Sequence, residues 1–482
     1  MPNADQVLTA AQMRAAEAAL IGAGTSVDEL MQRAGRGAAE WVWRMAAGRS
    51  VTVLCGPGNN GGDGYVIAEA LRERGGAVSV VVAAEPQTEA ARTARSLFKG
   101  AVVGPSATPP TLRQAQGDRL LVDCLFGTGL TRLLSDEHLA LLIRLAASHR
   151  QRIAIDLPSG VDSDSGAALN ENLPQYDLTI ALGAWKWAHW MMPAAQFMGH
   201  RKLVEIGVDA SAQRNYTTGQ VLRRPALTRP RPNAHKYTRG LLVIVAGDMP
   251  GAALLAARAA QHAGAGYVKI LSDGQALRAP DDVVIDSRPL SEALGDPRIS
   301  AILIGCGLGR GEVARNRLHD VVGSMSAAPI VLDGDALHLI EPIGLPSGRK
   351  VILTPHEGEL ATLAAAYRLP DCKPPLPWKV NRAIELNWAN CSIIVAKGPD
   401  TIVFDPDQGL AVAPMGSSWL STAGSGDVLA GAIASRLATG ADAFTAACQG
   451  VWLHGEAARL AGPAFTASEL ASAIKPALAS CL

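Results

Sequence analysis

The sequence predicts an α/β protein with two domains, each built around a parallel sheet. Short, apolar, β-branched segments alternate with helical stretches, and this alternation occurs twice, before and after a segment rich in Arg and Pro. Strands that are apolar on both faces are typical of parallel sheets covered by helices on both sides. With 482 residues, the chain is also too long for one ordinary core.

The first half begins with a helical pattern and continues with strands. Apolar residues recur at helical spacing over residues 9–47, and Thr9 and Gln12 have the spacing of a capping box. We therefore expect one helix there. Six strands are then predicted, at Val51–Cys55, Ala77–Ala83, Leu120–Asp123, Arg152–Asp156, Asp177–Leu182 and Lys202–Ile206. This order predicts a first domain over residues 1–212.

The second half repeats the alternation after a break. Residues 213–234 show no apolar period and contain a stretch rich in Arg and Pro at Arg223–Pro232, so this segment is predicted to be a connector. Six further strands are predicted, at Leu241–Val245, Tyr267–Leu271, Ala301–Ile304, Ile330–Leu332, Val351–Leu353 and Ser392–Ala396. Three helices are expected to begin near Gly424, Ala441 and Thr466. The second domain thus covers residues 213–482, connector included.

The overall composition excludes several classes of partner. The 44 basic and 44 acidic residues cancel, so there is no cationic surplus to attract nucleic acid or an anionic membrane. No apolar stretch is long enough for a membrane span, and the first residues lack a secretory pattern. The seven cysteines form no C-x-x-C pair, which indicates reduced core residues. We expect a cytoplasmic protein and leave a homo-oligomer open.

Three predicted strands of the first half end in polar or glycine-rich turns. Gly56–Gly64 holds five glycines between a strand and a helix, and Asp123 and Asp156 each end a strand before a further glycine-containing loop. In open parallel sheets, ligands bind outside the carboxyl ends of the strands. Each feature alone could be a structural turn or cap, but the three together favour a ligand site. The helix start after the glycines suits a pyrophosphate.

These segments read G-x-G-N-N-G-G-D-G, D-x-L-F-G-T-G-L and D-x-P-S-G-x-D. In this order they resemble the N-terminal domain of bacterial NAD(P)H-hydrate repair proteins, over roughly residues 1–210. The resemblance implies a Rossmann-like epimerase that interconverts the R and S hydrates at C6 of the nicotinamide ring. It implies that a potassium ion is held by Asn60, Asp123 and Ser159. It implies that the hydrate is bound by Asn59, Asn60, Gly61, Gly62, Asp63, Gly127, Thr128, Gly129, Leu130, Thr131, Arg132, Leu133 and Asp156, and that Asp156 is catalytic.

The residue types suit this chemistry. Potassium is a hard cation that prefers oxygen ligands, and epimerisation requires that a hydroxyl leaves and returns next to an electron-rich ring nitrogen. The Asp156 carboxylate could move a proton or stabilise the cationic ring between these steps. In the segment Ala184–Pro193, Lys186 matches the family, whereas Trp185, Trp187 and Trp190 depart from it. Core packing or a subunit contact is the favoured interpretation of these tryptophans, ligand stacking is the alternative, and His189 has no assigned role.

A second glycine-rich turn begins a helix near the end of the chain. Gly424–Gly431 reads G-S-G-D-V-L-A-G, a pattern whose backbone N–H groups can close around an anion, with Asp427 in the first turn of the helix. Asp427 could merely complement the helix dipole. The functional interpretation rests on the ordered segments upstream, which are His235–Gly240, Gly305–Gly309, Asp333–Leu337, Leu353–Glu359 and Lys397–Thr401.

This ordered set resembles the C-terminal, ribokinase-like dehydratase domain of the same repair proteins, over roughly residues 220–482. The resemblance implies that ADP, with Mg²⁺, phosphorylates the C6 hydroxyl of the S hydrate, after which phosphate leaves and NADH or NADPH is restored with AMP as co-product. Asp427 would be the catalytic base. Hydrate contacts would be Ala252, Gly307, His356 and Asp427. Nucleotide contacts would be Lys397, Gly398, Pro399, Asp400, Thr401 and Gly426.

One departure and two alternatives remain open at this point. The segment Met415–Leu420 lacks the asparagine and methionine usual in the family, so Ser417 or Ser418 would have to replace an amide hydrogen bond. The leading alternative function is a small-molecule kinase of the ribokinase class fused to a Rossmann-like regulatory domain. The second is a non-catalytic first half that serves as a scaffold.

Overall fold

The computed structural model describes residues 4–106, 119–209, 217–274, 277–340, 344–346, 348–371, 375–414 and 416–482. The chain forms two compact units, one of residues 1–220 and 374–377 and the other of residues 221–373 and 378–482. The division falls within strand β10 (Gly219–Val221), so a strand lies inside the predicted connector. The predicted boundary between residues 212 and 213 lies outside the described residues.

The first unit contains a parallel sheet with the strand order β4-β3-β2-β5-β6-β7-β9. Its strands are β2 (Ser50–Cys55), β3 (Val78–Val82), β4 (Ala101–Val103), β5 (Arg119–Cys124), β6 (Gln151–Ile155), β7 (Leu178–Leu182) and β9 (His200–Val204). The six predicted strands are confirmed to within about two residues at each end, and the short strand β4 was not predicted. The carboxyl ends of β2, β5 and β6 therefore meet at one edge of the sheet.

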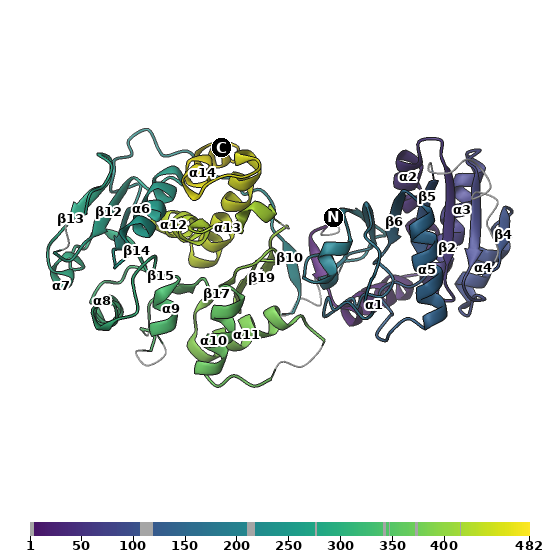
Figure 1. The fold of residues 1–482 in the computed structure, drawn as a ribbon, viewed down its shortest axis with the longest axis horizontal. Coiled ribbons are helices and arrows are strands. Elements are labelled where there is room, and N and C mark those ends of the chain that lie inside the picture. Colours follow the sequence, from purple (N-terminus) through teal and green to yellow (C-terminus); the bar gives the residue numbers. More distant parts are fainter. Residues whose placement is uncertain are drawn as a thin grey trace. The chain divides into compact units, whose positions relative to one another are not determined.

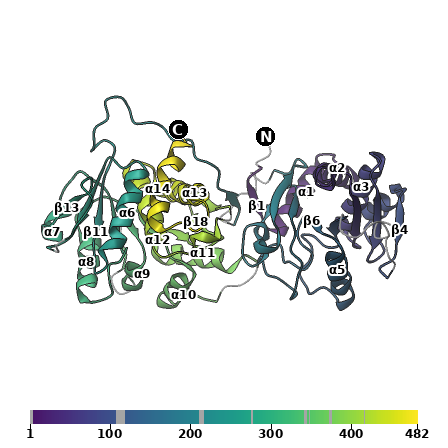
Figure 2. The same cartoon turned by 45° about the horizontal axis from the view of Figure 1, so that its top comes forward.

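Helices cover both faces of this sheet, as the apolar strands predicted. On one face, α2 (Val27–Ala46), α3 (Asn59–Glu73) and α4 (Glu89–Leu97) share a core with Val53 and Cys55. On the other, α5 (Asp136–Ser148) shares a core with the intervening residue Leu54, as the two-residue period of a strand requires. Figure 2 shows α2 and α3 on one side of β6 and α5 on the other.

The single helix predicted over residues 9–47 is wrong. The structure has two helices, α1 (Ala10–Gly22) and α2, because Gly24 takes a φ of +104° that a continuing helix does not allow. Ser26 then caps α2 by accepting a hydrogen bond from the backbone N–H of Glu29 at 3.1 Å. The capping box of Thr9 and Gln12 is confirmed.

Three short strands of the first unit lie apart from its main sheet. Strand β1 (Gln6–Leu8) pairs in parallel with β8 (Trp185–Lys186) and antiparallel with residues 219–220 of β10. The 3₁₀ helices η2 (Trp187–His189) and η3 (Ala194–Phe197) follow β8. Since β8 and η2 carry Lys186 and His189, this arrangement decides where those two side chains lie.

The second unit holds a sheet with the order β13-β12-β11-β14-β15-β16-β17-β18-β19. Neighbours are parallel from β13 to β17 and antiparallel from β17 to β19. The strands are β11 (Leu241–Val245), β12 (Tyr267–Leu271), β13 (Val284–Asp286), β14 (Ile299–Ile304), β15 (Ile330–Leu332), β16 (Val351–Leu353), β17 (Ile393–Ala396), β18 (Ile402–Asp405) and β19 (Gly409–Val412). The six predicted strands are confirmed; β13, β18 and β19 were not predicted.

The C-terminal helices gather on one side of this sheet. Figure 1 shows α6 (Pro250–His262), α12 (Ser425–Ala438), α13 (Ala443–Ala461) and α14 (Ala467–Ala479) close together, and their small apolar residues form two cores. The remaining helices of the unit are α7 (Leu290–Ala293), α8 (Glu312–Gly323), α9 (Asp335–Leu339), α10 (Glu357–Ala366) and α11 (Trp378–Asn390). The two-unit α/β fold with parallel sheets is confirmed. Among the described residues, no helix has both the length and the apolar composition needed to cross a membrane.

Candidate functional sites

Asp156 occupies a buried position at the carboxyl end of β6. Its Oδ1 atom lies 2.5 Å from Nζ of Lys186, and its Oδ2 atom accepts hydrogen bonds from both the backbone N–H (3.0 Å) and the hydroxyl of Thr128. Burial raises the pKa of Asp156, but the charge of Lys186 and the hydrogen bonds outweigh it, and the pKa is lowered from its ordinary value. The carboxylate is therefore ionised at neutral pH.

Asp123, in β5, and Ser159 are hydrogen-bonded to each other. Ser159 donates from its hydroxyl to Oδ1 of Asp123 at 2.8 Å and from its backbone N–H to Oδ2 at 3.1 Å. Oδ1 also accepts from the N–H of Leu125 at 3.0 Å, and Oδ2 from the hydroxyl of Tyr176 at 2.5 Å. These four bonds fill the acceptor capacity of the carboxylate. Burial still raises the pKa of Asp123.

Asn60 lies close to Asp156, on the other side of Gly127. A Cβ atom at Gly127 would lie 3.2 Å from Cγ of Asn60 and 3.0 Å from Oδ2 of Asp156, so a larger residue would crowd both side chains. Both amide atoms of Asn60 are buried and have no hydrogen-bond partner among the described residues. Such atoms are rare in folded proteins and indicate a missing partner.

The glycine-rich turn Gly56–Gly64 is tightly packed. A Cβ atom would lie 1.8 Å from the carbonyl oxygen of Leu125 at Gly56, and 2.0 Å from the carbonyl oxygen of Gly56 at Gly61. Close backbone packing alone therefore requires some of these glycines, whether or not the turn binds a ligand. The other predicted residues of the turn differ: Asn59 accepts a hydrogen bond from Thr88 at 2.6 Å, whereas Asp63 is buried, and burial raises its pKa well above the ordinary value.

The second predicted loop, 127–133, is mostly exposed. Its exposed members are Gly129, Thr131, Arg132 and Leu133, while Leu130 is buried. Thr128 alone among its side chains bonds to Asp156. The structure thus brings together Asn60, Gly127, Thr128 and Asp156, and it leaves the exposed residues free to meet a ligand.

The tryptophans of the segment 184–193 are packed inside the first unit. Trp185, Trp187 and Trp190 are all at least nine-tenths buried, and the rings of Trp185 and Trp190 make an edge contact at 4.9 Å. Core packing, the favoured interpretation, agrees with this burial. Between them, the sequence places Lys186 and His189, whose side chains both reach Asp156.

Asp427 lies in the first turn of α12, at a helix start made by glycine. Gly424 caps the helix with a φ of +89°, and the carboxylate of Asp427 lies with Sγ of Cys306 and the carboxylate of Asp333 in a group whose polar atoms are all within 4.8 Å of one another. Burial, and then the charge of Asp333, raise the pKa of Asp427 to about 6. This carboxyl group can therefore take up or release a proton near neutral pH.

Asp333 connects Asp427 to the strand end at Lys397. Its Oδ1 atom accepts from the hydroxyl of Thr354 and from Nζ of Lys397, both at 2.6 Å. Lys397 also lies 3.8 Å from Glu359. A Cβ atom at Gly426 would lie 3.6 Å from Nζ of Lys397, so this ammonium group adjoins the glycine turn. A cation beside a helix N-terminus suits a phosphate group.

The remaining predicted residues of the second unit are three hydrate contacts and the nucleotide contacts of residues 398–401. Gly307 adjoins Ala252, since a Cβ atom at Gly307 would lie 2.9 Å from that of Ala252. His356 is exposed and caps α10, and it lies 3.4 Å from Glu359. Gly398, Pro399, Asp400 and Thr401 form a turn in which Thr401 accepts from the N–H of Gly398 at 3.1 Å. Asp400 itself is buried in an ion pair with Lys379.

Several neighbours of these sites were not assigned a role from the sequence. Around Asp427 and Lys397 they are Cys306, Asp333 and Glu359. All three lie in the segments Gly305–Gly309, Asp333–Leu337 and Leu353–Glu359, whose positions at the ends of predicted strands could have indicated a role in the site. Around Asp156 they are Lys186 and His189. Tyr176 has no such signal, because its contact with Asp123 spans 53 residues and depends on tertiary packing.

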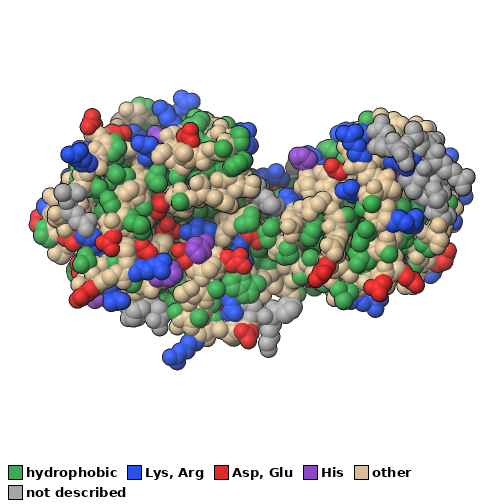
Figure 3. Space-filling view, viewed as in Figure 1, with side chains coloured by type: hydrophobic (Ala, Val, Ile, Leu, Met, Phe, Trp, Pro, Cys, Tyr) green, Lys and Arg blue, Asp and Glu red, His purple; other side chains and the backbone are tan. Residues whose placement is uncertain are grey.

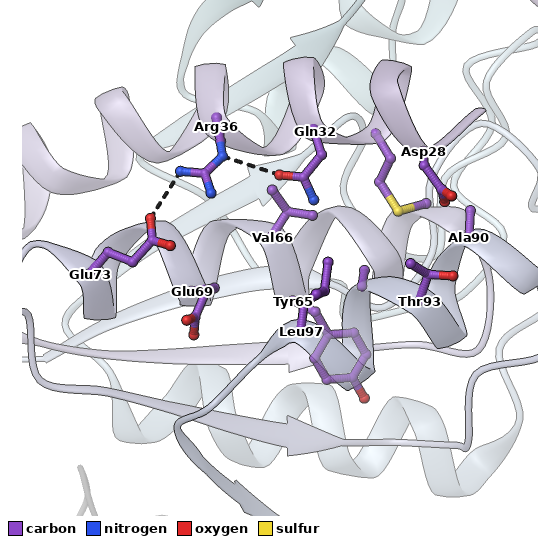
Figure 4. Close-up of a pocket in the computed structure, with 12 residues that line it drawn as sticks. Asp28, Gln32, Arg36, Tyr65, Val66, Glu69, Glu73, Ala90, Thr93 and Leu97 are labelled. Carbon is purple, nitrogen blue, oxygen red and sulfur yellow. Dashed lines mark hydrogen bonds and ion pairs between the residues drawn. The ribbon is translucent and has the colours of Figure 1, made fainter. Parts of the chain in front are cut away.

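One surface cavity of the first unit lies away from the predicted site residues. Figure 3 shows acidic, basic and histidine side chains gathered on one face of the second unit. In the first unit, a cavity of about 250 Å³ lies between α2, α3 and α4, lined in part by Gln32, Arg36 and Glu73, which bond to one another in Figure 4. None of the predicted site residues lines this cavity.

Comparisons with known proteins cover both units. Residues 27–188 match a family model described as YjeF-related protein N-terminus, and residues 242–478 match one described as NAD(P)H-hydrate dehydratase. The chain is 34% identical to the bifunctional NAD(P)H-hydrate repair enzyme of Gloeobacter violaceus, over 93% of this chain and 92% of that one. It is 32% identical to that of Thermosynechococcus vestitus, over 95% and 93%.

Among solved structures, the second unit is similar to the ADP/ATP-dependent NAD(P)H-hydrate dehydratase of Bacillus subtilis, with 27% identity and a TM-score of 0.44 over 53% of this chain and 95% of that one. The predicted resemblance is confirmed by the family models and the relatives, which match nearly the full length. The chain belongs to the family of bifunctional NAD(P)H-hydrate repair enzymes.

Proposed function

We propose that the first unit interconverts the R and S hydrates of NADH and NADPH, and that the second dehydrates the S hydrate with ADP. One observation carries this proposal. Each unit places a carboxylate, Asp156 or Asp427, at a strand or helix end where its neighbours shift its pKa in the direction that the chemistry requires. A scaffold domain has no need of the buried ion pair of Asp156. A cytosolic location and the oligomeric state stay predictions.

In the first unit, Asp156 is kept ionised by Lys186 and Thr128. An ionised carboxylate beside the nicotinamide ring would stabilise the positive charge that develops when the C6 hydroxyl leaves, and it could accept a proton from the water that returns. The hydroxyl returns to either face of C6, which exchanges R for S. The loop 127–133 and the turn at Asn59–Asp63 would hold the dinucleotide around this carboxylate.

The predicted potassium site fits the residues present. The amide oxygen of Asn60 is buried and unpartnered, and the hydroxyl of Ser159 lies close to the carbonyl oxygen of Phe126, at 3.2 Å. Hard oxygen donors of this kind suit potassium. Asp123 would act mainly by holding Ser159, because its oxygens already accept four hydrogen bonds, two of them from Ser159. When bound, the ion would supply positive charge for the phosphate oxygens of the dinucleotide.

In the second unit, Asp427 would take the proton of the C6 hydroxyl as that oxygen attacks the β-phosphorus of ADP, with AMP as the leaving group. The C–O bond to phosphate then breaks, and loss of a proton from C5 restores the double bond of the reduced nicotinamide. Lys397 and the glycine turn at Gly426 would stabilise the charge on the phosphoryl group as it moves.

The residues around Asp427 do not form a Mg²⁺ site by themselves. Asp333 is already paired with Lys397 and bonded to Thr354, and the third potential ligand is the thiol of Cys306, which Mg²⁺ disfavours. The predicted Mg²⁺ would therefore have to arrive on the phosphates of the nucleotide, and no step is assigned to it.

A direct assay tests the proposal. Hydrated NADH, as a mixture of both epimers, is incubated with the full chain and either ADP or ATP, and recovery of reduced-nicotinamide absorbance is followed. ADP should support recovery better than ATP, and recovery should include both epimers. A stable phosphorylated product made from ATP would instead favour a kinase of the ribokinase class.

A further inference from the structure

The backbone at Asp156 has an unusual conformation. Its φ is +63°, in the left-handed region that residues with a Cβ atom rarely adopt. The N–H of Leu157 donates to the carbonyl oxygen of Ile155 at 2.9 Å, so Asp156 is the central residue of a three-residue turn. Such a conformation persists only where the surroundings hold it.

His189 makes one of the contacts that hold this turn. Its side chain is fully buried, its Nε2 atom lies 2.7 Å from the carbonyl oxygen of Asp156, and its Nδ1 atom lies 2.9 Å from the backbone nitrogen of Lys186. A carbonyl oxygen can only accept and a backbone N–H can only donate, so the two bonds assign the proton to Nε2. Burial lowers the pKa of His189 to about 3, which keeps the ring neutral.

The same short segment also holds the side chain of Asp156. Lys186 donates from Nζ to the carboxylate at 2.5 Å and to the carbonyl oxygen of Leu182 at 2.7 Å. The ring of His189 packs edge-on against Trp185 at 5.4 Å, so it has little freedom to turn. Residues 186–189 therefore fix the carboxylate of Asp156 through the lysine and its main chain through the histidine.

We infer that His189 is a positioning residue for epimerisation, whose Nε2–H···O bond keeps the main chain of Asp156 in the left-handed turn that aims its carboxylate at the hydrate. This inference rests on the proposed role of Asp156. Loss of the bond lets the turn relax while the ion pair remains. Misplacement of a catalytic group by as little as 1 Å can cost about 10²-fold in rate, so the effect is expected in kcat rather than in KM.

Two variants of the full chain separate this role from simple packing. His189→Gln has an amide that reaches the place of Nε2 and can donate to Asp156, but it loses the acceptor that faces Lys186. His189→Asn reaches only the place of Nδ1, so it keeps that acceptor and loses the donor. Both replace the ring by a primary amide, which makes them matched controls.

The experiment measures epimerisation of pure R hydrate, with dehydration of S hydrate by the same chain as an internal control. We expect His189→Asn to lower kcat of epimerisation by about 10- to 100-fold with KM within about twofold, and His189→Gln to retain at least about a third of kcat. Dehydration should be unchanged in both, and thermal melting monitors the fold of the first unit.

Equal loss in both variants would assign His189 to packing alone, and full activity of His189→Asn would show that the bond is not needed; either result overturns the inference. Failure of the proposed function looks different. In that case the unmodified chain does not accelerate epimerisation, or Asp156→Ala remains fully active, whatever the His189 variants do.

Discussion

Lys186 and Asp156 form a buried ion pair, with Nζ and Oδ1 2.5 Å apart and the lysine side chain only 1% exposed. Such a pair contributes little net stability, because both charges lose their hydration, but removal of one partner leaves the other uncompensated. Its retention in the first unit is therefore better explained by what it does to Asp156 than by stability. It lowers the pKa of the carboxylate in a place where burial acts to raise it.

The first prediction separates the two units. Asp156→Ala should abolish the accelerated interconversion of R and S hydrates, because it removes the carboxylate that Lys186 and Thr128 hold at the end of β6, and it should leave dehydration of pure S hydrate intact. With a mixture of epimers and ADP, absorbance should recover quickly for the S portion and then stall at the spontaneous rate. Completion at the rate of the unmodified chain would contradict a role for this carboxylate.

The second prediction concerns the potassium site. When potassium is replaced by tetramethylammonium, the rate of epimerisation should fall, and added potassium should restore it. Asn60→Ala removes the unpartnered amide, so the potassium concentration that gives half of the maximal rate should rise by about 10-fold or more. Dehydration serves as the control. A potassium dependence that is the same in Asn60→Ala would place the ion elsewhere.

Much of the fold could be predicted because its strands carry a strong local signal. Leu241–Val245 is apolar at every position and Val51–Cys55 at every position except Thr52, as expected for parallel strands covered on both faces. The hairpin of β18 and β19 is not predicted although Asp405–Gly409 contains turn residues, since strands of only four residues have a weak pattern. The break between α1 and α2 was missed because Gly24 and Ser26 were read as part of one helical period.

The candidate sites were predicted as strand-end motifs, but their inner contacts could not be. Asp156, Asp123 and Asn60 follow three strands whose order in the sheet brings their ends together. The left-handed turn at Asp156 and its bond to His189 depend on a segment 33 residues away, whose position is decided by packing of the tryptophans. The sequence showed His189 but offered no local pattern for its role.

The third prediction tests whether Asp400 acts through structure or through the nucleotide. Asp400 and Lys379 are both about 95% buried and form an ion pair. Asp400→Asn should lower the free energy of unfolding of the second unit by about 3–5 kcal/mol, because it leaves a buried ammonium group without a counter-charge. The double variant Lys379→Met/Asp400→Leu should recover much of this loss in urea unfolding. A change in ADP affinity without loss of stability would instead support the predicted nucleotide contact.

The fourth prediction concerns the base of the second unit. Asp427→Asn keeps the size of the side chain and removes its ability to accept the proton, so turnover of S hydrate with ADP should fall by about two to four orders of magnitude. ADP binding, measured by calorimetry, should change little. Near-normal turnover together with a large loss of stability would return Asp427 to the role of a helix cap.

The last prediction follows from the pKa of Asp427, which burial and Asp333 raise to about 6. Only the ionised form can accept the proton, so dehydration should increase with pH up to about 6 and then level off. Asp333→Asn removes a negative charge next to Asp427, and the midpoint of this profile should move to lower pH.

The same raised pKa makes the free energy of unfolding change with pH in the opposite direction, since it falls as the pH rises. The pKa of an aspartate in the unfolded chain is about 3.9, so the folded state binds the proton more tightly. The stabilising contribution of the protonated form is complete below pH 4 and is lost as the pH rises through 6. Asp427→Asn should therefore raise the free energy of unfolding at pH 8 by about 1–2 kcal/mol, after a discount for partial exposure, and should change it little at pH 4. A gain in stability that is the same at both pH values would show that ionisation of Asp427 is not its cause.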